Sequence, residues 1–156
     1  MTSYSVGKGE VRIHPLVNEN DTDYKKLIEI AEFFAMKGET VTLTPKMSRR
    51  GDFRYEQIYG DLIGTKYEGK CPDLKVGDKW YEHEGYISEN PKNAFRNMLH
   101  DGLAQSSHLV IDTPNLTDHY MIRSIRGKIE RGERIEEVWL KDRDGKLRLL
   151  YKNTNG

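Results

Sequence analysis

The chain has 156 residues, and 25 lysines or arginines balance 25 aspartates or glutamates, so its formal net charge at pH 7 is zero. A chain of this length can bury a sizeable core as one domain. Zero net charge excludes a uniformly basic nucleic-acid coat, although a local basic groove remains compatible with it. Cys71 is the only cysteine, which excludes an intrachain disulfide and a multi-cysteine zinc site.

Nothing in the hydropathy pattern predicts a membrane segment. No apolar run approaches the ~20 residues that span a bilayer. The polar, glycine-bearing segment Met1–Glu10 has no hydrophobic signal-peptide core. We therefore expect a soluble, cytoplasmic protein without membrane contact, and its nine tyrosines, four phenylalanines and two tryptophans argue against disorder.

The first part of the chain predicts strands alternating with helices. The expected elements are a strand over residues 10–17, a helix over 24–37, a strand over 39–44 and a weakly helical segment over 53–63. In the 24–37 helix, apolar residues recur at positions 27, 30, 31 and 34, which is one helical face. Gly38 follows where a C-terminal cap is expected.

The remaining elements are marked by turn and capping residues. They are a hairpin over 67–86 that turns at Gly77 and Asp78, a helix over 91–105 capped by Asn90, a strand over 108–112, a helix capped by Thr117 and ended by Gly132, and a hairpin of 135–140 with 147–151. This order predicts an α/β (α+β) single domain with a central mixed sheet flanked by helices. Within it we expect an N-terminal arm and strand (1–21), a core (22–113), and a C-terminal helix and hairpin (114–156).

The first hairpin carries three acidic side chains that we expect to converge. Glu82 and Glu84 are two positions apart and so project from one face of a strand. A turn at Gly77 brings Asp73 back beside Glu82. Like charges a few ångströms apart are unfavourable unless a cation neutralises them or a proton is shared. Oxygen ligands of this kind suit Mg²⁺ or Mn²⁺.

Pro72-Asp73 followed by Glu82-His83-Glu84 resembles the PD-(D/E)xK nuclease superfamily, in the variant where glutamate replaces the motif lysine. Within it, the sequence is most similar to the tRNase domains of contact-dependent growth-inhibition toxins. Those domains also carry a lysine-preceded Pro-Asp, a short glycine turn and an acidic residue nine positions after the aspartate. The resemblance covers about residues 22–113 and implies a restriction-endonuclease-like core.

The resemblance implies a metal-dependent nuclease acting on RNA (tRNA foremost) or on DNA. Asp73, Glu82 and Glu84 are the implied catalytic residues and ligands of Mg²⁺ or Mn²⁺. Because Glu84 stands where the motif lysine belongs, water activation is expected to fall to the metal, to Glu84, or to Lys70 or Lys79. The toxins' delivery region is absent from this sequence, so we expect a small stand-alone protein associated with a mobile element, with a protein inhibitor or partner.

The helix after the hairpin carries the expected phosphate-binding residues. Lys92, Arg96 and His100 are spaced at i, i+4 and i+8 and form a cationic stripe off its apolar face. Such a stripe attracts phosphate to a site that is otherwise negative. We expect Lys70, Lys92, Arg96 and Gln105 to bind the substrate.

Two other hypotheses remain open. The missing motif lysine favours a non-catalytic descendant of the fold that binds nucleic acid or protein. A metal-independent ribonuclease would instead need a general base facing a second acid, for which His83, His100 and Glu84 are available. Each acidic residue also has a structural interpretation: Asp73 as a turn residue after proline, and the glutamates as the solvent face of an edge hairpin.

Overall fold

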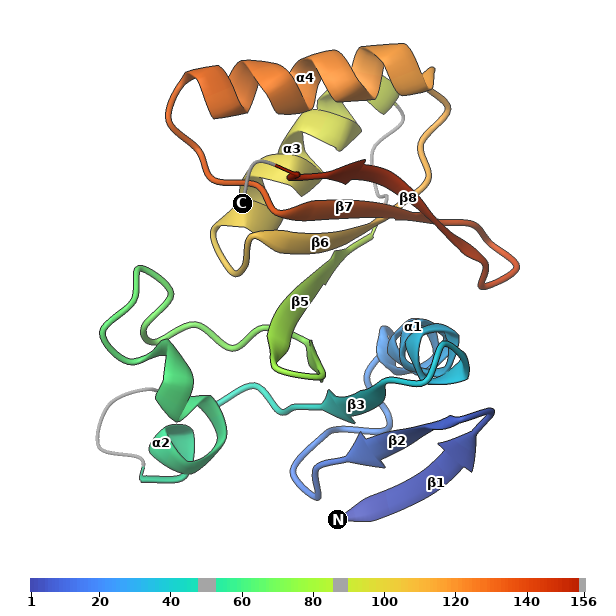
Figure 1. Ribbon diagram of the computed structural model, residues 1–156, viewed down its shortest axis with the longest axis vertical. Helices are drawn as coiled ribbons and strands as arrows, with labels where there is room; N and C mark the ends of the chain where they lie inside the picture. Colours follow the sequence, from blue (N-terminus) through green and yellow to red (C-terminus); the bar gives the residue numbers. More distant parts are fainter. Residues whose placement is uncertain (48–52, 86–89, 155–156) are drawn as a thin grey trace. The chain divides into compact units, whose positions relative to one another are not determined.

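The computed structural model describes residues 1–47, 53–85 and 90–154. The chain forms two compact units, Met1–Trp80 and Tyr81–Gly156, whose boundary falls inside strand β5 (Lys79–Glu84). Figure 1 shows the elements of both units in chain order. In the described parts of the chain, no helix has the length and apolar character that a bilayer crossing requires.

The first unit is built on a mixed set of strands. They are β1 (Thr2–Val6), β2 (Gly9–Ile13), β3 (Thr40–Leu43) and β4 (Leu74–Val76). Strand β2 pairs antiparallel with β1 and parallel with β3, and β3 pairs antiparallel with β4. Helix α1 (Tyr24–Met36) makes the crossover between the parallel strands, and Gly38 ends it at a φ of 99°.

The segment before β4 packs into a hydrophobic cluster of the first unit. Helix α2 (Phe53–Tyr59) buries Tyr55 and Tyr59 there, and the 3₁₀ turn Gly60–Leu62 buries Leu62. The buried members are Tyr55, Tyr59, Leu62, Cys71 and Trp80. The predicted helix over 53–63 is therefore confirmed. Phe53 is 69% exposed, so the helix packs through its tyrosines instead.

The second unit carries its helices on one face of its strands. Its elements are β5, α3 (Pro91–Leu103), β6 (His108–Asp112), α4 (Asp118–Glu130), β7 (Glu137–Lys141) and β8 (Leu147–Lys152). Strand β6 pairs parallel with β5 and with β7, and β8 returns antiparallel to β7. Both helices contribute to one apolar cluster with the inward residues of β6 and β7.

Both predicted helix starts in this unit are confirmed. The Asn90 side chain accepts hydrogen bonds from the main-chain amides of Lys92 and Asn93, at 3.1 and 3.2 Å. Thr117 accepts one from the amide of Tyr120 at 3.1 Å. Each cap satisfies amides that the first turn of a helix leaves without partners.

The α+β class, the mixed sheet and the flanking helices are as predicted. The largest differences are that strand β1 was not predicted, that β2 ends at Ile13 rather than at residue 17, and that the first arm of the 67–86 hairpin shortens to Leu74–Val76. The limits expected at residues 21 and 113 stay predictions.

Candidate active site

The main chain leading into Asp73 is anchored at each of its carbonyl groups. Tyr55 Oη donates to the carbonyl of Lys70 at 2.9 Å, and Lys46 Nζ donates to that of Cys71 at 2.7 Å. Thr44 donates to the next two carbonyl groups: its hydroxyl donates to the Pro72 carbonyl at 2.9 Å, and its amide donates to the Asp73 carbonyl at 3.3 Å. Residues 70–73 form no strand, so these bonds take the place of a ladder.

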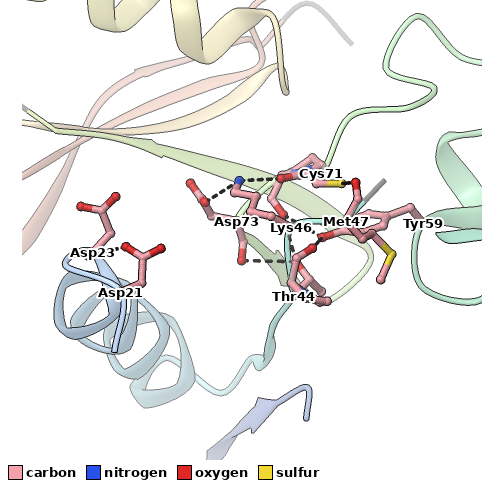
Figure 2. Close-up of polar contacts among 10 residues, drawn as sticks. Asp21, Asp23, Thr44, Lys46, Met47, Tyr59, Cys71 and Asp73 are labelled. Carbon is pink, nitrogen blue, oxygen red and sulfur yellow. Dashed lines mark hydrogen bonds and ion pairs between the residues drawn. The ribbon is translucent and has the colours of Figure 1, made fainter. Parts of the chain in front are cut away.

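The Asp73 carboxylate faces a cation from the end of β3. Lys46 Nζ lies 3.0 Å from Asp73 Oδ1 (Figure 2). The two side chains differ sharply in exposure, because Lys46 is 63% exposed while Asp73 is 12% exposed. The carboxylate is thus held within the unit, and its cation reaches it from solvent.

Tyr59 is a further hydrogen-bond donor to the segment that leads into Asp73. Its ring is fully buried and stacks with Tyr55, at a centroid distance of 5.1 Å. Burial raises the pKa of the Tyr59 hydroxyl far above its ordinary value, so the group stays protonated. It donates to the carbonyl of Pro45 at 2.6 Å and reaches that of Pro72 at 3.5 Å (Figure 2).

The two predicted glutamates lie in the second unit, on the face that α3 covers. Glu82 is the register partner of Leu109, and Glu84 that of Ile111; both partners belong to the apolar cluster under α3. A Cβ added to Gly102 of α3 would come within 3.1 Å of Glu84 Cγ, which places Glu84 beside that helix. Glu82 is 6% exposed, so its interpretation as part of a solvent face is wrong.

Asp73 therefore belongs to one unit and the glutamates to the other, and their convergence on one cation stays a prediction. Among residues 1–47, 53–85 and 90–154, no group of three His, Cys, Asp or Glu side chains is arranged to hold a metal ion. The oxygen atoms of the three carboxylates are the kind of ligand that a hard divalent cation prefers. The assignment of Mg²⁺ or Mn²⁺ to them depends on that chemistry.

The opposite face of β5 carries a buried polar network that the sequence did not predict. His83 Nε2 lies 2.8 Å from Asp112 Oδ1, and the His83 side chain is only 3% exposed. Beside this pair, Tyr81 Oη and Trp139 Nε1 both donate to Glu137 Oε1, at 2.6 and 2.7 Å. The available signal was the set of polar residues that alternation puts on this face, His108 and Asp112 of β6 and Glu137 and Lys141 of β7.

Three of the four expected substrate-binding residues lie on α3 or just after it, and the fourth lies in the first unit. Lys92, Arg96 and His100 are exposed on α3, as the predicted stripe requires. Lys92 Nζ lies 5.2 Å from the centre of the Tyr120 ring, and Arg96 Nη2 donates to Asn93 Oδ1 at 2.5 Å. Gln105 follows the helix and is half-buried.

Lys70, the fourth expected phosphate ligand, belongs to the first unit, where it precedes the anchored segment and is half-buried. The main chain of Lys70 is engaged on both sides, through its amide to the Tyr67 carbonyl at 2.9 Å and through its carbonyl to Tyr55. Its place beside Cys71 keeps it next to the proposed catalytic segment.

The chain thus has an α+β fold with parallel and antiparallel strand pairs, and Asp73 is anchored directly before the short strand β4. In solved structures this fold is similar to a chain of the CdiA-CT/CdiI toxin and immunity complex from Burkholderia pseudomallei, at a TM-score of 0.51 and 18% identity. The match covers 91% of this chain and 94% of that one, and it shows a shared fold. No family model matches the sequence, and no curated protein matches it either.

Proposed function

We propose that this protein is a toxin-like nuclease of the PD-(D/E)xK type, which hydrolyses phosphodiester bonds of RNA, tRNA foremost, with Mg²⁺ or Mn²⁺. The observation that carries the proposal is the anchoring of Asp73. A carboxylate that ligates a catalytic metal must be held within about 0.5 Å of its working position. Four side-chain or main-chain donors on consecutive carbonyls give the Asp73 segment that restraint.

The proposal assigns Asp73, Glu82 and Glu84 as the metal ligands. A divalent cation bound there would polarise the scissile phosphate and lower the pKa of a bound water. Asp73 and Glu82 supply buried or nearly buried negative charge, which a cation offsets. Glu84 is half-buried, and in this proposal it would be the third ligand or orient the attacking water.

Positive side chains on α3 suit the substrate part of the proposal. Lys92 and Arg96 lie on its exposed face, and a phosphate diester needs such cations next to a negative site. Gln105, just beyond the helix, adds a neutral hydrogen-bonding group. The balanced net charge confines this attraction to the local patch, so the affinity for RNA should fall with salt with the shallow slope of a few phosphate contacts.

A second candidate is a non-catalytic module of the same fold that binds a protein or nucleic acid. The ion pair between Lys46 and Asp73 favours it, because the proposed ligand already has a cation. The structurally similar chain belongs to a complex of a toxin with an immunity protein, which supports a protein partner for either function.

The test is calorimetric titration of Mn²⁺ and Mg²⁺ into the metal-free protein, into Asp73→Ala and into Glu82→Gln. The matched control is Asp78→Ala, which removes an exposed carboxylate from the turn of the same hairpin. We expect micromolar to low-millimolar binding in the wild type and the control, and loss of at least about tenfold in affinity in both site variants.

Cleavage assays then separate the two candidates. Binding together with Mn²⁺-dependent cleavage of a tRNA pool, lost in Asp73→Ala, supports the nuclease, and a parallel assay on single- and double-stranded DNA defines the substrate. Binding of RNA without cleavage under any metal supports the non-catalytic module. Absence of both metal binding and cleavage in the wild type removes the proposed mechanism.

A further inference from the structure

We propose that Lys46 is the positioning residue of the candidate active site and orients the Asp73 carboxylate from the segment that follows β3. The sequence pointed to Lys70 and Lys79, and only for water activation. The structure instead puts the Lys46 ammonium 3.0 Å from Asp73 Oδ1, at the end of β3. This inference rests on the proposed nuclease function.

The ammonium acts on two points of the same segment. It donates to the Cys71 carbonyl at 2.7 Å and to the Asp73 carboxylate at 3.0 Å, so it bridges both sides of Pro72. The bridge fixes the direction of the Asp73 side chain, whereas Thr44 and Tyr59 hold only its main chain.

The position of Lys46 follows from strand register rather than from local sequence. The antiparallel pairing of β3 with β4 sets Leu43 opposite Leu74, and the amide of Thr44 continues the ladder to the Asp73 carbonyl. Two residues further along, Lys46 has passed the end of the ladder, and its ammonium reaches back to the Cys71 carbonyl and the Asp73 carboxylate.

Removing the charge of Lys46 should have opposite effects on metal affinity, depending on whether Lys46 orients Asp73 or only stabilises the fold. The ammonium competes with a divalent cation for Asp73, so removing its charge should tighten metal binding. Removing it should also free the carboxylate to rotate, and a displaced ligand slows the chemical step by about tenfold or more. A lysine that only stabilises the fold would lower metal affinity and activity together.

The experiment compares Lys46→Met and Lys46→Arg with Lys75→Met. Lys75 makes a similar ion pair on β4 of the same unit, 2.9 Å from Asp61 Oδ2, and it also lies over the Trp80 ring, so its loss should cost at least as much stability. The measurements are Mn²⁺ affinity by calorimetry, melting temperature of the metal-free protein, and the rate of RNA cleavage at saturating Mn²⁺.

In Lys46→Met we expect Mn²⁺ to bind about three- to tenfold tighter while cleavage falls at least about tenfold. We expect Lys46→Arg to restore part of the rate and Lys75→Met to resemble the wild type in both. Parallel loss of affinity and rate in Lys46→Met, or values equal to those of Lys75→Met, overturns the role of Lys46 alone. A wild-type protein that neither binds Mn²⁺ nor cleaves RNA overturns the proposed function and this role with it.

Discussion

The Pro72 carbonyl receives two donors, which makes the anchoring of Asp73 measurable by a double-mutant cycle. Thr44 Oγ1 donates to it at 2.9 Å, and Tyr59 Oη reaches it at 3.5 Å while donating mainly to the Pro45 carbonyl at 2.6 Å. Thr44 is 9% exposed and Tyr59 is fully buried, so water cannot replace either hydroxyl. Thr44→Val and Tyr59→Phe each remove one donor with little change in shape.

A buried neutral hydrogen bond contributes about 1 kcal/mol to stability, and an acceptor left without a partner costs about 1–3 kcal/mol. In Thr44→Val, the Pro72 carbonyl keeps the longer contact with Tyr59, so we expect a loss of about 1 kcal/mol. Tyr59→Phe leaves the Pro45 carbonyl without its donor, so we expect about 1–2 kcal/mol. In the double variant the Pro72 carbonyl loses both donors, and the loss should exceed the sum by about 0.5–1 kcal/mol.

The free energy of unfolding of the four proteins is measured by urea denaturation of the metal-free protein at pH 7, monitored by tryptophan fluorescence. Thr44→Ser supplies the control, because it keeps the hydroxyl and should show no coupling to Tyr59→Phe. Additive losses within about 0.3 kcal/mol in the Val–Phe cycle would show that the two hydroxyls do not share the carbonyl.

Three further predictions concern the frame around the site. Gly9→Ala should unfold the first unit or cost more than about 3 kcal/mol, because its Cβ would clash with the main-chain carbonyl oxygens of Ala35 in α1 and of Glu39 before β3; denaturation measures the loss. Asn90→Ala should cost about 1 kcal/mol through the lost cap of α3, read as a lower melting temperature. Arg148 donates to Asp118 at 2.8 Å and lowers the pKa of that carboxyl. Its exposed pair contributes at most about 1 kcal/mol, so Arg148→Ala should lower stability slightly at pH 7, and the difference should vanish as the pH falls through the lowered pKa of Asp118 and the carboxyl is protonated.

The elements that sequence reasoning located are those with local signals. The apolar spacing in 24–37 and the caps at Asn90 and Thr117 depend on residues within one or two helical turns, so they act whatever the rest of the chain does. The turn at Gly77, with a φ of 59°, is equally local. Strand β1 carries no such signal, since most of its residues are polar or exposed and pairing with β2 defines it.

In the candidate site, too, local patterns predict some features, whereas others depend on how distant segments pair. Pro72-Asp73 and Glu82-x-Glu84 can be read as motifs, and the sharing of one strand face by the two glutamates follows from alternation. The contact of Lys46 with Asp73 joins positions 27 apart and depends on the register of β3 against β4. A shift of one residue would turn Thr44 away from the Pro72 carbonyl, and no local pattern states which register is adopted.

The contrast in exposure between Lys46 and Asp73 bears on how the site would take up a metal. Asp73 is restrained by its main chain, whose donors are independent of the carboxylate charge. The Lys46 pair is an exposed one, and such pairs contribute at most about 1 kcal/mol. A divalent cation can therefore compete for the carboxylate at small cost, while the ammonium keeps its hydrogen bond to the neighbouring Cys71 carbonyl. On this reasoning the ion pair keeps a ligand-ready aspartate neutralised in the metal-free protein, and it does not argue against metal binding.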